Sequence, residues 1–231
     1  MCSSIAGKGA LLSLTIAVGL FLSGTSKGSD GGWTSLFDGA TLSGWVQQGV
    51  FSEPFRVQDG QIVGPSARNA FLCTTRDYAD FILELEVRIP VPLNSGIQVR
   101  SHRFDHETKL EWNGKVIVVP AGRVHGYQIE IDPSKRAWTG GFYEEGRRGW
   151  IQNLEKNEAA RQAFRPGEWN LLRIECRGDA IKSWINGVPA ADVRDTIDRS
   201  GFIALQVAHG GQKTGNPLEV RFRNIRIKEL P

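Results

Sequence analysis

The stretch FILELEVRIP, residues 81–90, decides the fold class, because apolar and polar side chains alternate along it. A period of two residues is typical of a β-strand with one buried face and one face in water. Pro90 and Pro92 then end the strand. The apolar face holds Phe81, Leu83, Leu85, Val87 and Ile89, and the polar face holds Glu84, Glu86 and Arg88.

The same alternation recurs along the rest of the chain. Residues 172–177 and 181–185 are predicted to form a hairpin, and Asn186-Gly187 is a favoured turn before another strand at Val188. In the closing run, residues 219–230, the apolar phase slips by one residue near Arg223-Asn224, which predicts a β-bulge there. The stretch from Asn153 to Phe164 is read as a short surface helix or an ordered loop. Many short strands with Gly, Pro and Asn turns predict an all-β sandwich or jelly roll.

The N-terminus has the pattern of a signal peptide. After Lys8, residues 10–22 are uncharged and apolar, a run shorter than the roughly 20 residues that a membrane-spanning helix needs. We therefore expect residues 1–26 to be removed on export and residues 27–231 to form one secreted or periplasmic domain, with no membrane attachment after cleavage. An uncleaved anchor is the alternative reading.

Charge and cysteine content limit the partners of the chain and its cross-links. The formal net charge is +3, with Lys and Arg scattered among acidic residues, so a nucleic-acid partner is not expected. Beyond the predicted leader the chain holds Cys73 and Cys176. In an oxidising compartment a disulfide could persist, and buried free thiols are equally compatible with their apolar surroundings.

Polar side chains on three predicted strands suggest a binding groove. Gln128, Glu130 and Asp132 share one face of their strand, Gln98 and Arg100 share one face of a second, and Gln206 belongs to a third. If the strands are neighbours, these groups converge into a groove suited to the hydroxyl groups of a carbohydrate. The alternative is that they simply face water. Aromatic residues and arginines following the first strand could form the rim of the groove: Trp138, Phe142, Tyr143 and Trp150, with Arg147 or Arg148 as a donor.

Several motifs, taken in order, resemble the 3-keto-disaccharide hydrolase-like domain family. They are SLFDG at 35–39, FRVQDGQIVG at 55–64, NSGIQVR at 94–100, HGYQIEID at 125–132, EWNLLRIECRGDAIKSWINGV at 168–188 and LQVAHGG at 205–211. The resemblance implies a concanavalin A-like jelly roll in an exported protein. Many relatives carry Glu and then Gln where this chain has Gln128 and then Glu130, so the carboxylate lies about 6.7 Å farther along the strand.

The resemblance also implies cleavage of glycosides whose glucose C3 hydroxyl is already a ketone. That ketone acidifies the C2 hydrogen, so a base can start an elimination that hydration then completes. In this scheme Glu130 is the base, Arg100 with Gln98 or Gln128 stabilises the enolate, and His209 is the acid or proton shuttle. His209 precedes Gly210-Gly211 and could instead serve a turn.

Other chemistry stays open for the same residues. The sequence identifies no definite cofactor, although Glu130, Asp132 and a histidine could bind a divalent cation. Glu130 and Asp132 could also be the paired carboxylates of a laminarinase-like glycosidase. A noncatalytic carbohydrate-binding module would need only the groove and its aromatic rim. In every version the expected partner is a carbohydrate.

Overall fold

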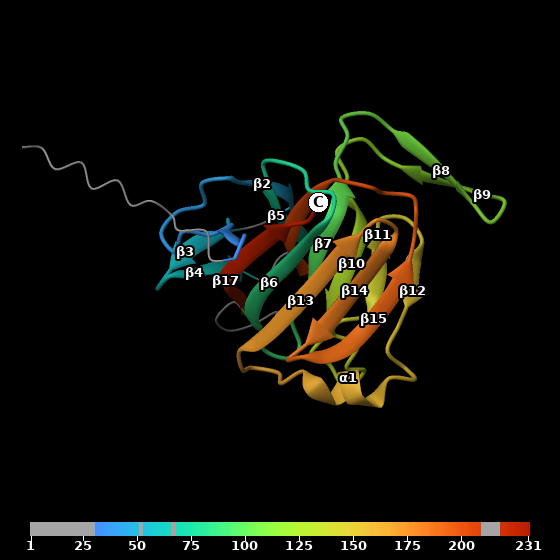
Figure 1. Cartoon of the computed structure of the whole chain (residues 1–231). Coiled ribbons are helices and arrows are strands. Elements are labelled where there is room, and N and C mark those ends of the chain that lie inside the picture. The colour runs from blue at the N-terminus through green and yellow to red at the C-terminus, as the bar shows by residue number, and fades with distance from the viewer. Residues whose placement is uncertain (1–30, 51–52, 66–67, 209–217) are drawn as a thin grey trace, which may run out of the picture.

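Two antiparallel β-sheets face each other across one core in the computed structural model (Figure 1), which describes residues 31–50, 53–65, 68–208 and 218–231. The predicted signal peptide and His209 lie outside the described residues. The eight-stranded sheet holds, in spatial order, β15 (Val188–Arg194), β14 (Ala180–Ile185), β13 (Asn170–Arg177), β6 (Phe81–Arg88), β17 (Glu219–Glu229), β4 (Gln61–Pro65) and β3 (Arg56–Gln58), with β1 (Thr34–Ser35) paired to β17.

The second sheet has seven strands and carries the polar faces noted in the sequence. Its spatial order is β12 (Gly149–Gln152), β11 (Phe142–Glu145), β10 (His125–Ile131), β7 (Asn94–His102), β16 (Phe202–Ala208), β5 (Arg68–Thr74) and β2 (Trp45–Val50). A separate hairpin of β8 (Thr108–Trp112) and β9 (Lys115–Val119) projects from one end of the sandwich (Figure 1). The predicted all-β sandwich is confirmed.

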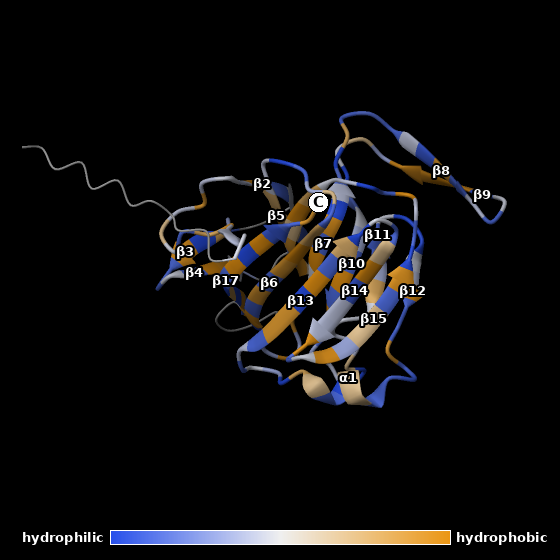
Figure 2. Ribbon diagram, in the orientation of Figure 1, coloured by the Kyte–Doolittle hydropathy of each residue, from blue (hydrophilic) through white to orange (hydrophobic). Residues whose placement is uncertain are grey.

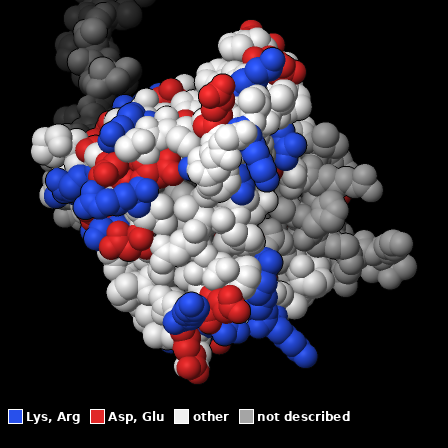
Figure 3. All heavy atoms as spheres, turned by 90° about the vertical axis from the view of Figure 1, so that its right-hand side faces the viewer, with Lys and Arg blue, Asp and Glu red and all other residues white. Residues whose placement is uncertain are grey.

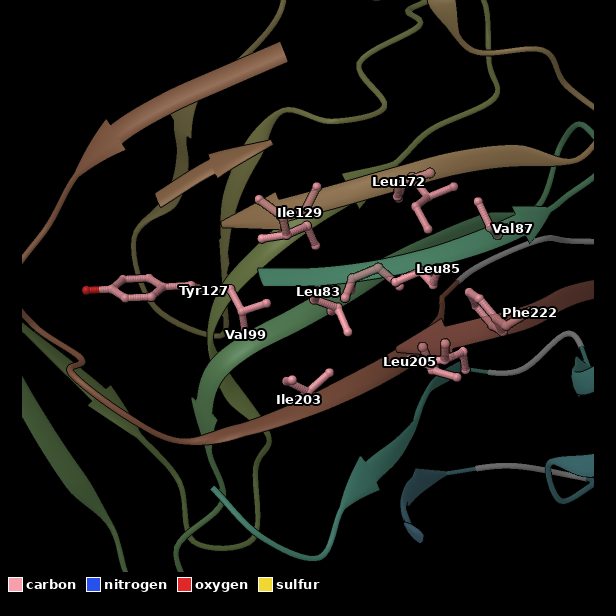
Figure 4. Close-up of a cluster of buried hydrophobic side chains, with 14 of the residues drawn as sticks. Leu83, Leu85, Val87, Val99, Tyr127, Ile129, Leu172, Ile203, Leu205 and Phe222 are labelled. Carbon is pink, nitrogen blue, oxygen red and sulfur yellow. The ribbon is translucent and has the colours of Figure 1, made fainter. Parts of the chain in front are cut away.

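Alternation along the strands produces the core. Strand β6 is buried at every second residue, and Figure 2 shows the hydrophobic and hydrophilic positions alternating along it. Leu83, Leu85 and Val87 meet Ile129 and Leu205 of the other sheet in one cluster (Figure 4). Each such aliphatic side chain contributes about 1.5–3 kcal/mol when it is fully buried. Packing between the sheets therefore fixes which strand faces remain outside.

Two irregular positions bear on the sequence predictions. The register of β17 against β6 shifts between Arg223 and Arg226, and Asn224 has a φ of 52°, so the predicted bulge is confirmed. The helix α1 (Glu158–Ala163) is shorter than the predicted segment, and the Asn157 side chain caps it by accepting from the Ala160 N–H at 3.1 Å.

Cys73 and Cys176 are both buried free thiols, one in each sheet. Burial raises the pKa of each thiol to about 12, which keeps both protonated. The alternative of a disulfide between them is therefore wrong.

Charges on the surface are mixed in sign. Figure 3 shows Lys and Arg interspersed with Asp and Glu on the face that carries β12 and β15. Within the part of the chain that the structure describes, no helix is long and apolar enough to cross a membrane.

Candidate functional site

A polar hollow of about 300 Å³ lies on the outer face of the seven-stranded sheet. Its size is at the lower end of small-molecule sites. Strands β11, β10, β7 and β16 lie side by side there, which is the adjacency that the groove prediction required. The residues that line it are Asn69, Asn94, Gln128, Glu130, Arg136, Tyr143, Glu145, Trp150, Gln206 and Ala208.

Glu130 is the most enclosed acid in the hollow, with 5% of its surface exposed. The Asn94 Nδ2 group donates to Oε1 at 2.8 Å, and the Gln128 Nε2 group donates to Oε2 at 2.8 Å. Burial raises the pKa of the Glu130 carboxyl, and the bonds from Asn94 and Gln128 offset part of that rise. A carboxylate that is short of water yet held in place is a stronger base than an exposed one.

Two side-chain amides in series, Gln98 and Gln128, hold Glu130 in place. Gln98 is fully buried; its Nε2 group donates to Gln128, and its Oε1 atom accepts from the Ser101 hydroxyl at 2.9 Å. Gly96 makes the arrangement possible, because a Cβ atom there would lie 2.6 Å from the side-chain Cδ of Gln128. Gln98 therefore orients Gln128 and is not itself part of the lining.

Asp132 holds an arginine beside Glu130. The Arg136 Nε donates to Asp132 Oδ2 at 2.6 Å, and the Arg136 Nη2 lies 3.7 Å from Glu130 Oε1. Burial alone would raise the pKa of Asp132, but bonds from Ser134 and Arg136 hold it below its ordinary value. Asp132 thus stays charged and fixes the guanidinium at the edge of the hollow.

The aromatic rim forms around the same arginine. Trp150 packs edge to face against Trp138 at 4.9 Å and against Tyr143 at 5.3 Å between ring centroids. The Arg136 guanidinium lies 4.7 Å from the Trp138 ring centroid, and Trp138 packs against Trp150 without itself lining the hollow. The prediction that Phe142 belongs to the rim is wrong, because Phe142 is fully buried and packs in the core against Tyr127.

Arg100 does not reach the hollow, and its predicted place beside Gln98 is wrong. A bulge between Val99 and His102 reverses the alternation, and Arg100 has a φ of 46°. Its buried guanidinium instead donates to the carbonyl oxygens of Ala79 and Gly178, each at 2.7 Å, and pairs with Asp80 at 2.8 Å. These partners border the opposite sheet, so Arg100 ties the two sheets together.

Arg147 and Arg148 also point away from the hollow, so the prediction that one of them donates at the rim is wrong. Arg147 pairs with Glu144 at 2.7 Å and also with Asp198, and Arg148 pairs with Glu144 and Asp195. The network meets the core at Tyr127, whose hydroxyl accepts from the Asp198 N–H at 2.9 Å. Figure 4 shows that hydroxyl pointing away from the aliphatic cluster.

The described histidines lie outside the lining of the hollow. His102 Nε2 lies 3.1 Å from Asp198 Oδ1, and His106 lies beside Asp105 in an exposed loop. His125 is buried, and among the described residues neither of its ring nitrogens has a hydrogen-bond partner. Burial, aided by the charges of Arg147 and His102, lowers the pKa of His125 to about 4, so its ring is neutral.

The acids of the hollow do not fit a cation site. Over the described ranges, no group of three His, Cys, Asp or Glu side chains is placed to hold a metal ion. Both carboxylates already accept hydrogen bonds: Glu130 accepts from the amides of Asn94 and Gln128, and Asp132 accepts from Arg136.

Sequence reasoning missed five residues that line the hollow, which are Asn69, Asn94, Arg136, Glu145 and Ala208. Glu145 projects from β11 on the same face as Tyr143, two residues earlier, and that alternation was the signal that could have found it. Asn94 begins β7, and its side chain holds Glu130. Burial raises the pKa of Glu145, and the charge of Arg123 opposes that rise.

Comparison with known proteins agrees with the resemblance noted in the sequence. The model of the 3-keto-alpha-glucoside-1,2-lyase-like domain matches residues 32–228. The comparison with curated proteins found no match.

Solved structures share the sandwich at low sequence identity. A candidate glycosyl hydrolase of Parabacteroides distasonis is 18% identical with a TM-score of 0.55, covering 87% of this chain and 95% of that one. The carbohydrate-binding module CBM66 of Bacillus subtilis is 16% identical with a TM-score of 0.54, covering 82% and 98%. The β-glucanase of Bacillus licheniformis is 13% identical with a TM-score of 0.53, covering 86% and 97%. The fold is therefore the concanavalin A-like jelly roll that the resemblance implied.

Proposed function

The chain belongs to the family of 3-keto-alpha-glucoside-1,2-lyase-like domains, and on this premise we propose that it cleaves 3-keto-glycosides by elimination followed by hydration. Glu130 takes the proton from C2 of the oxidised sugar. The observation that carries the proposal is the buried Glu130 carboxylate, fixed by Asn94 and Gln128 at 2.8 Å each in a hollow of sugar-binding chemistry.

The arrangement around Glu130 suits a base. Asn94 and Gln128 both contact Glu130 through side-chain amide N–H groups, which orient a carboxylate without protonating it. Burial raises the pKa of Glu130, which increases its affinity for a proton. Positioned general bases of this kind contribute about 10²–10⁴-fold to rate.

Two further groups supply what the enolate and the sugar ring need. Burial raises the pKa of the Tyr143 phenol, so Tyr143 keeps its proton and can donate to the ketone oxygen as that oxygen gains charge. Trp150 lines the hollow beside Tyr143 and offers a ring for the apolar face of a sugar. We also propose export through residues 1–26, which would bring the domain to extracellular or periplasmic sugars.

The test compares a 3-keto-glycoside with its unoxidised parent. We expect wild-type protein to release sugar from 3-keto-trehalose, to leave trehalose intact, and in D₂O to place deuterium at C2 of the product. Glu130→Gln keeps the shape of the side chain and removes the base, so turnover should fall at least 10²-fold while sugar binding remains. Glu155→Gln, an exposed acid outside the hollow, is the matched control and should keep full activity.

Three outcomes would contradict the proposal. Cleavage of trehalose in preference to its 3-keto form would identify an ordinary glycosidase. Binding of both sugars with cleavage of neither would identify a carbohydrate-binding module. Full activity of Glu130→Gln would remove Glu130 from the reaction.

A further inference from the structure

We propose that Glu145 is a second catalytic residue of the hollow, the acid that gives a proton to the departing glycosidic oxygen. The inference rests on the proposed function, because it completes the elimination that Glu130 begins. Glu145 thus takes the proton-donating step that the sequence-based scheme gave to His209.

Glu145 and Glu130 approach the hollow from neighbouring strands. On β11, Tyr143 lies opposite Gln128 of β10 and Glu145 lies opposite Gly126, so Glu145 faces the hollow beyond Tyr143. Both acids line the hollow, as does the Tyr143 phenol. A sugar bound over Tyr143 would therefore have one acid on each side.

The contacts of the two carboxyls differ in a way that separates their roles. Glu130 accepts two N–H groups at 2.8 Å, whereas the side-chain contacts of Glu145 within the described ranges are long, 3.4 Å to Arg123 Nη2 and 3.4 Å to Gln206 Nε2. Short donation from two amides favours a carboxylate, and loose contacts leave a carboxyl free to hold its proton.

Gln206 gives independent evidence of an incomplete polar site beside Glu145. It is 1% exposed and lines the hollow, and within the described part of the chain its Oε1 atom has no hydrogen-bond partner. A buried acceptor without a partner is costly, so such groups mark places where a ligand donor fits. A sugar hydroxyl is a donor of that kind.

Burial raises the pKa of both carboxyls, so the division of roles rests on their contacts and not on the direction of their pKa shifts. Burial raises the pKa of Glu145, while the charge of Arg123 and the long hydrogen bonds oppose that rise.

The step balances without any other reactant. The Glu130 carboxylate takes the C2 proton, and the C2–H electron pair forms the enolate. The enolate pair then restores the C3 ketone as a C1–C2 double bond forms, the C1–O bond breaks, and the departing oxygen takes the proton of Glu145. In hydration, the Glu145 carboxylate takes a proton from water as the water oxygen bonds to C1, and Glu130 returns its proton to C2.

The test uses two leaving groups with wild-type protein, Glu145→Gln and the control Glu155→Gln. The alkoxide that leaves 3-keto-trehalose needs a proton, whereas the nitrophenoxide that leaves 4-nitrophenyl 3-keto-α-glucoside does not. We expect Glu145→Gln to slow cleavage of 3-keto-trehalose about 10²–10⁴-fold and cleavage of the nitrophenyl substrate less than about tenfold. Deuterium exchange at C2 of 3-keto-trehalose should persist, because Glu130 is intact.

Each other result overturns the proposal in a recognisable way. Equal losses on both substrates, or no loss on either, would exclude Glu145 as the acid. A loss confined to 3-keto-trehalose in His209→Gln, with Glu145→Gln fully active, would give the role to His209. Failure of wild-type protein on both keto substrates would overturn the proposed function itself.

Discussion

Replacing Glu144 by Gln should lower the free energy of unfolding more than replacing an exposed acid does. The Glu144 carboxylate is fully buried and accepts from Arg148 Nη2 at 2.8 Å, while Arg147 Nη2 lies 2.7 Å away. Both guanidinium groups are almost fully buried as well. Glu144→Gln keeps the volume of the side chain but leaves two buried cations with one fewer counter-charge.

The contacts set the size of the effect. Removing one partner of a buried ion pair costs about 3–5 kcal/mol. Asp195 and Asp198 remain to compensate Arg148 and Arg147, so we expect the lower end, about 3 kcal/mol. For a domain of this size, that loss lowers the melting temperature by about 6–12 °C.

Urea denaturation followed by tryptophan fluorescence measures this loss, with Glu111→Gln, an exposed acid on β8, as the control. At a slope of about 1–3 kcal/mol per molar urea, the Glu144→Gln midpoint should fall by about 1 M or more with an unchanged slope. A change in the free energy of unfolding below about 1 kcal/mol would refute the reasoning that Glu144 is essential charge compensation.

Three further predictions follow from the hollow and from the ion network. Gly96→Ala places a Cβ atom 2.6 Å from Gln128 Cδ, so it should displace Gln128 and lower kcat at least about tenfold while the circular dichroism spectrum is retained. Trp150→Ala should raise KM about 2- to 12-fold, the equivalent of one lost aromatic contact of about 0.5–1.5 kcal/mol, with kcat nearly unchanged. Burial works against ionisation of Asp195 and Asp198, but their arginine, His and Tyr partners hold both pKa values below the ordinary aspartate value. Their stabilisation is therefore present above about pH 5 and should be lost as the pH falls below 4, which unfolding scans at several pH values would detect.

Alternation alone predicted most of the fold, because the two packed sheets require one buried face from each strand. The residues of β6 that were assigned to the core are buried, and the slip at Asn224 marked a true bulge. The same rule failed at Arg100. A second bulge lies there, and the spacing of the apolar residues does not change at it, so the sequence gives no sign of it. Alternation predicts which face of a strand a side chain lies on only where the strand is regular.

The candidate site was harder to predict, because it depends on contacts between distant segments. Gln128 and Glu130 were assigned to one face from the sequence, and the hollow contains both. Asn94 and Glu130 are 36 residues apart, and nothing local in the sequence indicates that their side chains meet. Arg147 looked like a free donor, since its acidic partner Asp198 comes from a loop 51 residues away.

The pairing of β1 with β17 has a consequence for how the sandwich can be carried. Thr34 lies opposite Ile227, so a polypeptide enters and leaves the fold at one place on the eight-stranded sheet. The hollow opens on the other sheet, away from that place. A longer polypeptide could therefore carry the sandwich with both of its connections on the eight-stranded sheet, while the hollow lies on the other sheet.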